Sequence, residues 1–438
     1  MKQRVLTGTA VLATASLLLA ACGGGSDEED KGGGVAADGS VTLTLAGWSL
    51  SSTPEFQVLA DAFHEENPDV TVELVEYADG EDYDTQMITD LAAGTAPDLY
   101  PIKNLNKFFT YEDGDQLMDV SDVAEGLGED VDGLDQYQVD GSTYAIPYRQ
   151  DAWFLYYNKD LFDKADVDYP DGSWTWEDYG NAAEALTENL ADTDTPATGA
   201  YQHEWQSTVQ GFATAQTPDA DFTSGDWEYM VPYYERSLAL QDEGAQIDYG
   251  TQTTNNLTYQ AEFGTQDAAM LLMGSWYIAT LLAEQDSGDA DDFKWGIAPA
   301  PQLDESTVDE PITFADPTGI GLNPAIDDDL VEPAKKFLSF IASDEAASAL
   351  AEIGITPAVN NDTVAESFFN IDGMPTDDLS RFTFSNHDVR PENVVGPNTA
   401  ALQNILSDAH SAIMSESVSA QEGIDQAMQR AQDEVLGN

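Results

Sequence analysis

Aromatic rings and polar side chains crowd into one segment of the chain, residues 145–162, with the sequence AIPYRQDAWFLYYNKDLF. The rings offer flat apolar faces, and Arg149 and Asp151 offer hydrogen-bond donors and acceptors of fixed direction. A plain core strand has no need of Arg149, Gln150 and Asp151. The segment is therefore either a buried strand with polar neighbours or the wall of a binding site.

The second half of this segment has the pattern of a buried strand. Alternation puts Trp153, Leu155 and Tyr157 on one face and the rings of Phe154 and Tyr156 on the other. Both faces are apolar, which is typical of a strand that is covered on both sides. We therefore predict that this half belongs to the core.

Strand and helix patterns alternate along the first hundred residues. Residues 41–45 alternate apolar and polar side chains, Pro54 opens an amphipathic helix, and residues 70–77 read as the next strand. This order predicts an open, largely parallel sheet, whose ligands bind beyond the carboxyl ends of the strands. Trp48 lies at such an end and is a candidate ligand contact. Asp98 is expected to order its own turn.

The first 21 residues have the pattern of a signal peptide, in which Lys2 and Arg4 precede a short apolar run. Cys22, the only cysteine, ends the sequence LAAC, which resembles a bacterial lipobox. Residues 23–40 are rich in glycine and acids, so residues 22–40 are predicted to be a lipidated cysteine and a flexible tether. We expect the mature protein to be extracytoplasmic, held on the outer face of the cell membrane through Cys22.

Composition limits the classes of function. A chain of 438 residues with 42% hydrophobic residues is long and apolar enough for two or three domains. The formal net charge of -67 excludes a nucleic-acid binder, which needs basic patches. Habitat, lineage or an acidic surface for a cationic ligand would each explain this charge. The four histidines are scattered and no phosphate loop or nucleophile elbow is present, so we predict no catalytic residue, no metal and no cofactor.

Seven short motifs stand in order along the chain after the lipobox. The motifs are GTAPDL (94–99), DGSTYAIPY (140–148), YYNKDLF (156–162), SWTWEDY (173–179), AAMLLMGSW (268–276), AKKFLSFIAS (334–343) and GITPAV (354–359). Together with the lipobox they resemble the extracellular solute-binding proteins of ABC transporters, in particular the carbohydrate-binding group (family 1) that includes maltose-binding protein. The resemblance covers nearly the whole chain after Val41.

The resemblance implies an α/β fold of two lobes, each a mixed, mostly parallel sheet flanked by helices, with the ligand cleft between them. Residues 41–150 and about 317–375 would form the first lobe. Residues about 151–316 and about 376–438 would form the second, with the lobe of the C-terminal helices left open. Hinge closure around the ligand is the expected motion.

The chain would cross between the lobes near residues 149–157 and return near residues 314–318. Asp151, on the first crossing, matches a family carboxylate that accepts hydrogen bonds from sugar hydroxyls. Arg149 either bonds the sugar or pairs with an acid. Asp316, on the return, either faces the ligand or orders the hinge. The polar run at residues 149–151 is thus expected at the floor of the cleft.

The resemblance also implies ligand contacts away from the crossings. Trp276, in GSW, matches a family residue that stacks on sugar, and Trp205, in YQHEWQ, matches another contact. His203 either contacts the ligand or lies on the surface. Asn104 occupies a polar family position. Arg390, in NHDVRPEN, sits on a loop that resembles a lid.

The function implied is that of a substrate-binding lipoprotein of an ABC importer, and not of an enzyme. It would capture a sugar or oligosaccharide outside the membrane and deliver it to the permease subunits. The expected partners are this ligand, the permease and the membrane, and the chain is expected to be a monomer. Two alternatives stay open. One is a binder of a polyamine, amino acid or peptide, with Arg149 or Arg390 on a carboxylate. The other is a secreted glycosidase, which needs two carboxylates at a set separation.

Overall fold

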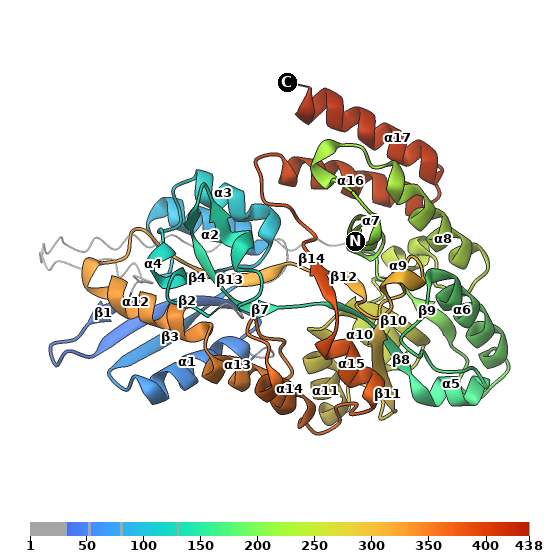
Figure 1. The fold of residues 1–438 in the computed structure, drawn as a ribbon, viewed down its shortest axis with the longest axis horizontal. Coiled ribbons are helices and arrows are strands. Elements are labelled where there is room, and N and C mark those ends of the chain that lie inside the picture. The colour runs from blue at the N-terminus through green and yellow to red at the C-terminus, as the bar shows by residue number, and fades with distance from the viewer. Residues whose placement is uncertain (1–32, 51–53, 79–81, 129–130, 438) are drawn as a thin grey trace, which may run out of the picture. The chain divides into compact units, whose positions relative to one another are not determined.

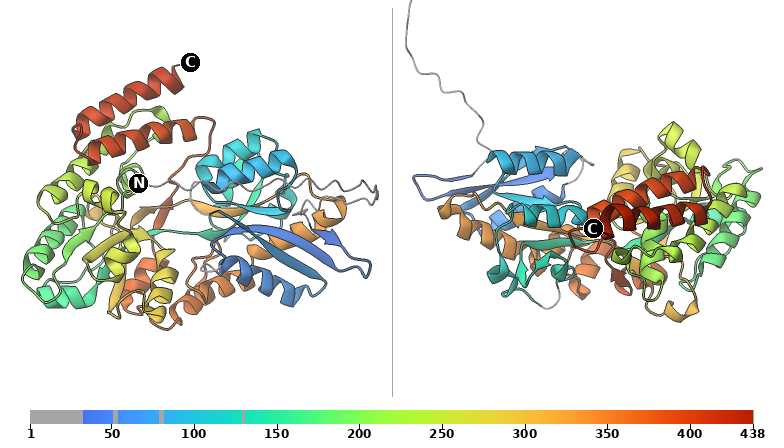
Figure 2. Two further views of the ribbon diagram at one scale, coloured as in Figure 1. Left: turned by 180° about the vertical axis from the view of Figure 1, so that it is seen from behind. Right: turned by 90° about the horizontal axis from the view of Figure 1, so that it is seen from above.

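The computed structural model describes residues 33–50, 54–78, 82–128 and 131–437 (Figures 1 and 2). The predicted signal peptide, Cys22 and the predicted tether as far as residue 32 lie outside the described residues. Within the described part, no helix combines the length and the apolar character that crossing a membrane requires.

The first sheet combines strands from the start of the chain with one from far later. Its order is β1-β2-β4-β13-β7, and β3 also pairs with β2. β2 runs parallel to β3 and β4, whereas β13 is antiparallel to both of its neighbours. The strands are β1 (Gly34–Val35), β2 (Val41–Trp48), β3 (Val70–Tyr77), β4 (Leu99–Ile102), β7 (Ala145–Gln150) and β13 (Pro317–Leu322).

Helices cover this sheet and share one hydrophobic core with it. On α1 the predicted apolar stripe of Phe56, Leu59, Ala60 and Phe63 is buried, which confirms the periodicity argument. The helices are α1 (Glu55–Glu66), α2 (Asp82–Ala93), α3 (Phe108–Asp113), α4 (Ser121–Ala124), α12 (Asp328–Ile341) and α13 (Asp344–Ala351). Smaller elements are η1 (Leu105–Lys107), η2 (Leu134–Tyr137), β5 (Gln138–Val139) and β6 (Ser142–Thr143).

The second sheet has the order β11-β8-β10-β9. β10 is parallel to β9, and β8 is antiparallel to both β10 and β11. Both sheets are therefore mixed, with more antiparallel pairing than the sequence predicts, because β8 and β13 enter between strands that run the other way. The strands are β8 (Trp153–Asn158), β9 (Thr198–Tyr201), β10 (Ala268–Gly274) and β11 (Trp295–Pro299).

A second hydrophobic core surrounds this sheet and includes the C-terminal helices. The predicted capping box at Thr175 and Asp178 is present at the start of α6. The helices are α5 (Lys159–Ala165), α6 (Trp176–Leu190), α7 (Ser207–Gln216), α8 (Val231–Asp242), α9 (Tyr249–Asn255), α10 (Tyr259–Gly264), α11 (Tyr277–Ser287), α14 (Asp362–Phe369), α15 (Asp378–Ser385), α16 (Thr399–Met414) and α17 (Ala420–Arg430). Short turns are η3 (Phe222–Ser224), η4 (Glu228–Met230), η5 (Glu305–Thr307) and the π-helical η6 (Ala431–Leu436).

Two short links carry the chain between the sheets. Residues 151–152 join β7 to β8, and residues 315–316 join β12 (Ile312–Phe314) to β13. Both fall where the crossings were expected. β12 pairs in parallel with β14 (Asp388–Arg390), so a segment near the C-terminus lies beside the second link (Figure 1). Both links therefore run past the space between the two sheets.

Part of the predicted tether is folded. β1, within residues 22–40, pairs antiparallel with the start of β2. The Gly33 N–H donates to Asp98 Oδ2 at 2.9 Å, and the Thr44 N–H donates to the same oxygen at 2.8 Å. Asp98 therefore orders the backbone around it, as predicted, and also anchors the segment before β2. From Gly33 onward, the flexible-tether expectation is wrong.

The proposed lobe limits stay predictions. Core contacts place Val364 and Phe368 of α14 with the second sheet, although the segment about 317–375 was expected in the first lobe. α16 packs against α17 and α8, which associates the C-terminal helices with the second sheet.

Candidate ligand-binding site

A cavity of about 770 Å³ lies between the two sheets. The last residue of β2 and the segments that follow β4 and β10 reach it, as expected for a site at strand ends. The links at Asp151 and Asp316 form part of its wall. The lining residues are Trp48, Lys103, Asn104, Leu105, Asn106, Arg149, Asp151, Trp153, Trp205, Gln206, Ser207, Tyr259, Trp276, Ala315, Asp316, Pro317, Thr318, Glu392, Asn393 and Gln403.

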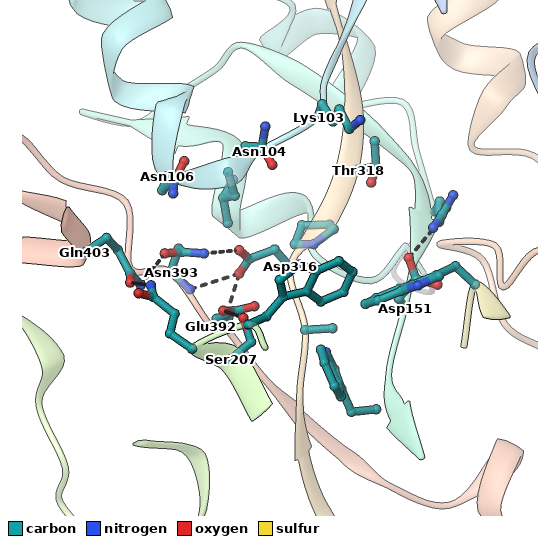
Figure 3. Close-up of a pocket in the computed structure, with 18 of the residues that line it drawn as sticks. Lys103, Asn104, Asn106, Asp151, Ser207, Asp316, Thr318, Glu392, Asn393 and Gln403 are labelled. Carbon is teal, nitrogen blue, oxygen red and sulfur yellow. Dashed lines mark hydrogen bonds and ion pairs between the residues drawn. The ribbon is translucent and has the colours of Figure 1, made fainter. Parts of the chain in front are cut away.

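Most of the residues singled out from the sequence meet in this cavity, although they come from distant segments. Figure 3 shows Asp316 and Glu392 close together and Asp151 apart from them, on the right, with Asn104 and Lys103 above. The candidate residues that line the cavity are Trp48, Asn104, Arg149, Asp151, Trp205, Trp276 and Asp316.

His203 lies behind the lining rather than in it. Its ring packs against Trp205, with 4.5 Å between ring centroids, and against Tyr259 at 5.3 Å. Burial lowers the pKa of His203 to about 4, so the ring is neutral at pH 7. His203 is therefore buried rather than on the surface, and it does not line the cavity. It supports two of the aromatic rings that face the cavity.

Arg390 was expected on a lid and is instead held away from the cavity. Because β14 pairs with β12, Arg390 donates to the Ala215 carbonyl at 2.6 Å and pairs with Asp388 at 3.2 Å. Two and three residues further on, Glu392 and Asn393 reach the cavity. The quoted segment therefore lines the cavity through residues other than Arg390.

Aromatic rings form one wall of the cavity. Trp205 is 40% exposed, unusual for so large an apolar side chain, and its ring centroid lies 6.4 Å from that of Trp276. Trp276 stands edge-on to Trp153 at 5.6 Å. Trp48, at the end of β2, packs edge-on against Phe56 at 5.0 Å. These rings offer flat apolar surface to a solute in the cavity.

The position of Trp276 depends on the glycine before it. The ring lies over Gly274, the last residue of β10, so closely that a Cβ there would be 2.0 Å from Trp276 Cζ3. The GSW motif therefore has a steric reason: glycine leaves room for the indole at the strand end.

Arg149 links two buried carboxylates beside this wall. Its Nη1 donates to Glu55 Oε2 at 2.8 Å, and its Nε donates to Asp151 Oδ2 at 2.6 Å. Burial disfavours the guanidinium, but Asp151 and Glu55 outweigh it and raise the pKa of Arg149. Asp151 Oδ1 also accepts from the Ser275 hydroxyl at 2.7 Å. The pairing alternative for Arg149 is thus confirmed, although its side chain still lines the cavity.

A second polar group surrounds Asp316. Its Oδ1 accepts from the backbone N–H groups of Glu392 and Asn393, both at 3.0 Å, and its Oδ2 accepts from Asn393 Nδ2 at 2.6 Å. Burial raises the pKa of Asp316 to about 6. Burial and the charge of Asp316 raise the pKa of Glu392 to about 8. At pH 7 Glu392 is therefore largely protonated, and the two carboxyl groups share roughly one negative charge.

Asn104 and Lys103 form the side of the cavity next to β4. Asn104 Nδ2 donates to the buried Asp84 at 2.6 Å, which fixes the orientation of the amide and leaves its oxygen for the cavity. Lys103 Nζ lies 4.7 Å from the ring centroid of Trp48. Burial lowers the pKa of Lys103 to about 8, so the amine is still mainly charged at pH 7.

Sequence reasoning missed several lining residues. Three of them lie at the start of α7 or within α16, on polar helix faces that look like ordinary solvated faces in the sequence. They are Gln206, Ser207 and Gln403. Glu392 and Asn393 stand in the quoted motif NHDVRPEN, and that motif was the only signal that could have found them. Trp153 was predicted as core; it is buried, yet its edge reaches the cavity.

The chemistry of the cavity suits noncovalent binding of a polar solute. Flat rings, carboxylates and amides line it, which is the combination expected for a hydroxyl-rich ligand with apolar faces. Within the described residues, no group of three or more His, Cys, Asp or Glu side chains could hold a metal ion.

Similarity to known proteins agrees with this geometry. The family model for bacterial extracellular solute-binding proteins matches residues 47–348. A binding protein of Brucella abortus is 31% identical over 150 residues, which are 31% of this chain and 33% of that protein. The chain thus aligns with about a third of the length of that relative. An arabinooligosaccharide-binding protein of Halalkalibacterium halodurans is 27% identical over 234 residues, 52% of each chain.

A solved structure extends the likeness to the whole fold. The crystal structure of a sugar transporter from Rhizobium etli, in an open conformation, superposes with a TM-score of 0.77 at 29% identity. The superposition covers 89% of this chain and 98% of the other. The two-lobed α/β architecture is therefore shared along nearly the entire length.

Proposed function

Because the chain belongs to the bacterial extracellular solute-binding protein family, which binds solutes and is not a family of enzymes, we propose that it captures a sugar or oligosaccharide for an ABC importer. The ligand would bind in the cavity between the sheets and be delivered to the permease subunits after the lobes close. The arabinooligosaccharide-binding relative and the sugar transporter of similar fold support a carbohydrate ligand.

The observation that carries this proposal is the pair of rings at the cavity mouth. Trp205 and Trp276 come from different segments, and Trp205 remains 40% exposed within an otherwise well-packed region. A pyranose face laid on these rings would bury that apolar surface. Asn104 and Asp151 would then face the hydroxyls of the sugar, as the resemblance implies.

A thermal-shift screen tests the proposal directly. A ligand present at one hundred times its dissociation constant stabilises the folded state by about 2.7 kcal/mol. We expect one or more sugars to raise the melting temperature, and Trp205→Ala to abolish that rise. Trp227→Phe is the matched control, because Trp227 is fully buried in the core away from the cavity. The proposal fails if amino acids, peptides or polyamines stabilise the protein and no sugar does.

The membrane anchor is a separate part of the proposal. The order LAAC at Cys22 supports lipidation and attachment to the outer face of the cell membrane. We expect Cys22→Ser to leave ligand binding intact and to release the protein from the membrane fraction. Retention of that variant in washed membranes would contradict the anchor and leave the binding proposal untouched.

A further inference from the structure

The two acidic ends of the cavity are compensated differently. Asp151 forms an ion pair with Arg149. Asp316 and Glu392 have no lysine, arginine or histidine partner within the described residues; their hydrogen bonds come from backbone N–H groups, Asn393 and Ser207. Burial disfavours the charged form of a carboxyl group, so two neighbouring carboxyl groups in a half-buried wall without a cation cost folding free energy.

The surroundings of this pair add further acceptors. Asn106 Oδ1 and Gln206 Oε1 are buried and have no hydrogen-bond partner within the described part of the chain. Both residues line the cavity in the same region: Gln206 bonds to Gln403 of α16, and Asn106 lies in η1, which contacts α16. We call Asn106, Gln206, Asp316 and Glu392 the acceptor end. A ligand group that fits it has to bring donors.

The other charges of the cavity are already engaged. Arg149 is held by Glu55 and Asp151, and Lys103 lies over Trp48 on the side next to β4. The charge acting on Glu392 is that of Asp316, which raises the pKa of Glu392 in the same direction as burial does. Protonation of Glu392 removes one of the two negative charges but supplies no positive charge to Asp316.

From this arrangement we propose that the acceptor end binds the ammonium group of an amino sugar. This inference rests on the proposed carbohydrate function and names the chemical class of the ligand. An ammonium group brings a positive charge and three N–H donors, enough for the two carboxylates and one of the two amide oxygens. Its arrival would expel the proton that Glu392 holds near neutral pH, and that proton would pass to the buffer. The net charge of -67 would also raise the local concentration of a cationic solute.

Calorimetric titration of matched sugars tests the inference. The probes are glucosamine, galactosamine and mannosamine, each against the parent sugar with a hydroxyl in place of the amine, and β-1,4-linked trimers of glucosamine and glucose. The protein is the full chain carrying Cys22→Ser. We expect at least one amine to bind ten or more times tighter than its hydroxyl partner at pH 7.

Glu392→Gln keeps the shape of the side chain and removes its charge. We expect this variant to reduce the amine preference to within about twofold, while neutral-sugar affinity changes by less than about threefold. Glu204→Gln is the charge-matched control, because Glu204 is exposed, precedes Trp205 and does not line the cavity. Equal loss in both variants would mean that only long-range charge matters and would overturn the inference.

The protein with Glu392 intact provides a second readout, the release of a proton on binding. Titration in two buffers of different ionisation enthalpy should show proton release when the amine binds and none when the neutral sugar binds. Neutral sugars that bind as tightly as their amines, without proton release, would overturn the inference and leave the proposed function standing. If spermidine binds and no sugar of either kind does, both proposals fail.

Discussion

The Arg149 guanidinium donates from Nε to Asp151 Oδ2 at 2.6 Å, across the point where the chain leaves the first sheet for the second. The same guanidinium holds Glu55 of α1, which is fully buried. One cation thus ties a helix of the first sheet to the link beside the cavity. The ion pair has a structural role in addition to any contact with ligand.

Replacing this cation should destabilise the fold. In Arg149→Met the carboxylate of Glu55 stays buried without its partner, so we expect the free energy of unfolding to fall by about 3–5 kcal/mol. Urea denaturation followed by circular dichroism measures it. Arg430→Met is the control: Arg430 pairs with Asp408 and Glu434 on the surface, and its loss should cost less than about 1 kcal/mol. Similar losses in both variants would contradict the role assigned to Arg149.

A methyl group at Gly274 should disturb ligand binding more than stability. The added Cβ would lie 2.0 Å from Trp276 Cζ3, so the indole has to leave the cavity wall. Stacking on such a ring contributes about 0.5–1.5 kcal/mol beyond burial, and each 1.4 kcal/mol is tenfold in affinity. We therefore expect Gly274→Ala to weaken the binding of any stabilising sugar by roughly two- to tenfold.

Gly180→Ala provides the comparison for Gly274→Ala. Gly180 lies within α6, and a Cβ there would meet its nearest neighbour, Leu240 Cδ2, at an ordinary 3.9 Å. Affinity for the same sugar should not change in this variant, and the helix should gain a little stability. Unchanged affinity in Gly274→Ala as well would show that the Trp276 ring does not contact the ligand.

Acid should destabilise the protein through buried histidines. Burial lowers the pKa of His410 to about 4, and the ring accepts from Tyr234 and donates to the Glu204 carbonyl. A lowered histidine pKa means that folding favours the neutral ring. This stability is fully present above the unfolded value of about 6.5 and is lost as pH falls towards 4, by up to on the order of 3 kcal/mol. His410→Gln should flatten the fall in melting temperature between pH 6.5 and 4.5; an unchanged slope would contradict this account.

High pH should destabilise the protein through ionisation of Glu392. A raised carboxyl pKa means that the folded state favours the protonated form, so its contribution is present at low pH and is lost as pH rises through about 8. Glu392→Gln cannot ionise. We expect it to raise the melting temperature of the ligand-free protein at pH 8.5 and to change it little at pH 5. A uniform shift at both pH values would exclude ionisation as the cause.

The sequence predicted local structure well where the pattern is local. The stripe on α1 and the capping box at Thr175 follow from spacing alone, and both are present. Which strands pair with one another does not depend on local sequence alone. Nothing in the sequence around residues 317–322 indicates that this strand enters the first sheet between β4 and β7, because strand pairing depends on the return of the chain from the second sheet.

The site shows the same division. Trp48 and Trp276 were accessible to prediction because Trp48 ends a strand and Trp276 lies two residues beyond the end of another. Glu392 and Gln403 were not, because acids and amides are abundant in this chain and no spacing rule separates a lining side chain from a solvated one. Arg390 shows that the prediction can miss by two residues. Because β14 pairs with β12, Arg390 does not line the cavity, whereas Glu392 does.

The placement of β13 has a consequence for how the chain acquires its structure. Ile320 pairs with Ile146 on one side and Pro101 on the other, so the first sheet lacks a central strand until more than two thirds of the chain is available. An N-terminal fragment ending at β7 would leave β4 and β7 with open edges, which favour aggregation. Pairings so distant in sequence also form slowly. The first sheet can therefore be completed only after every strand of the second sheet has been synthesised.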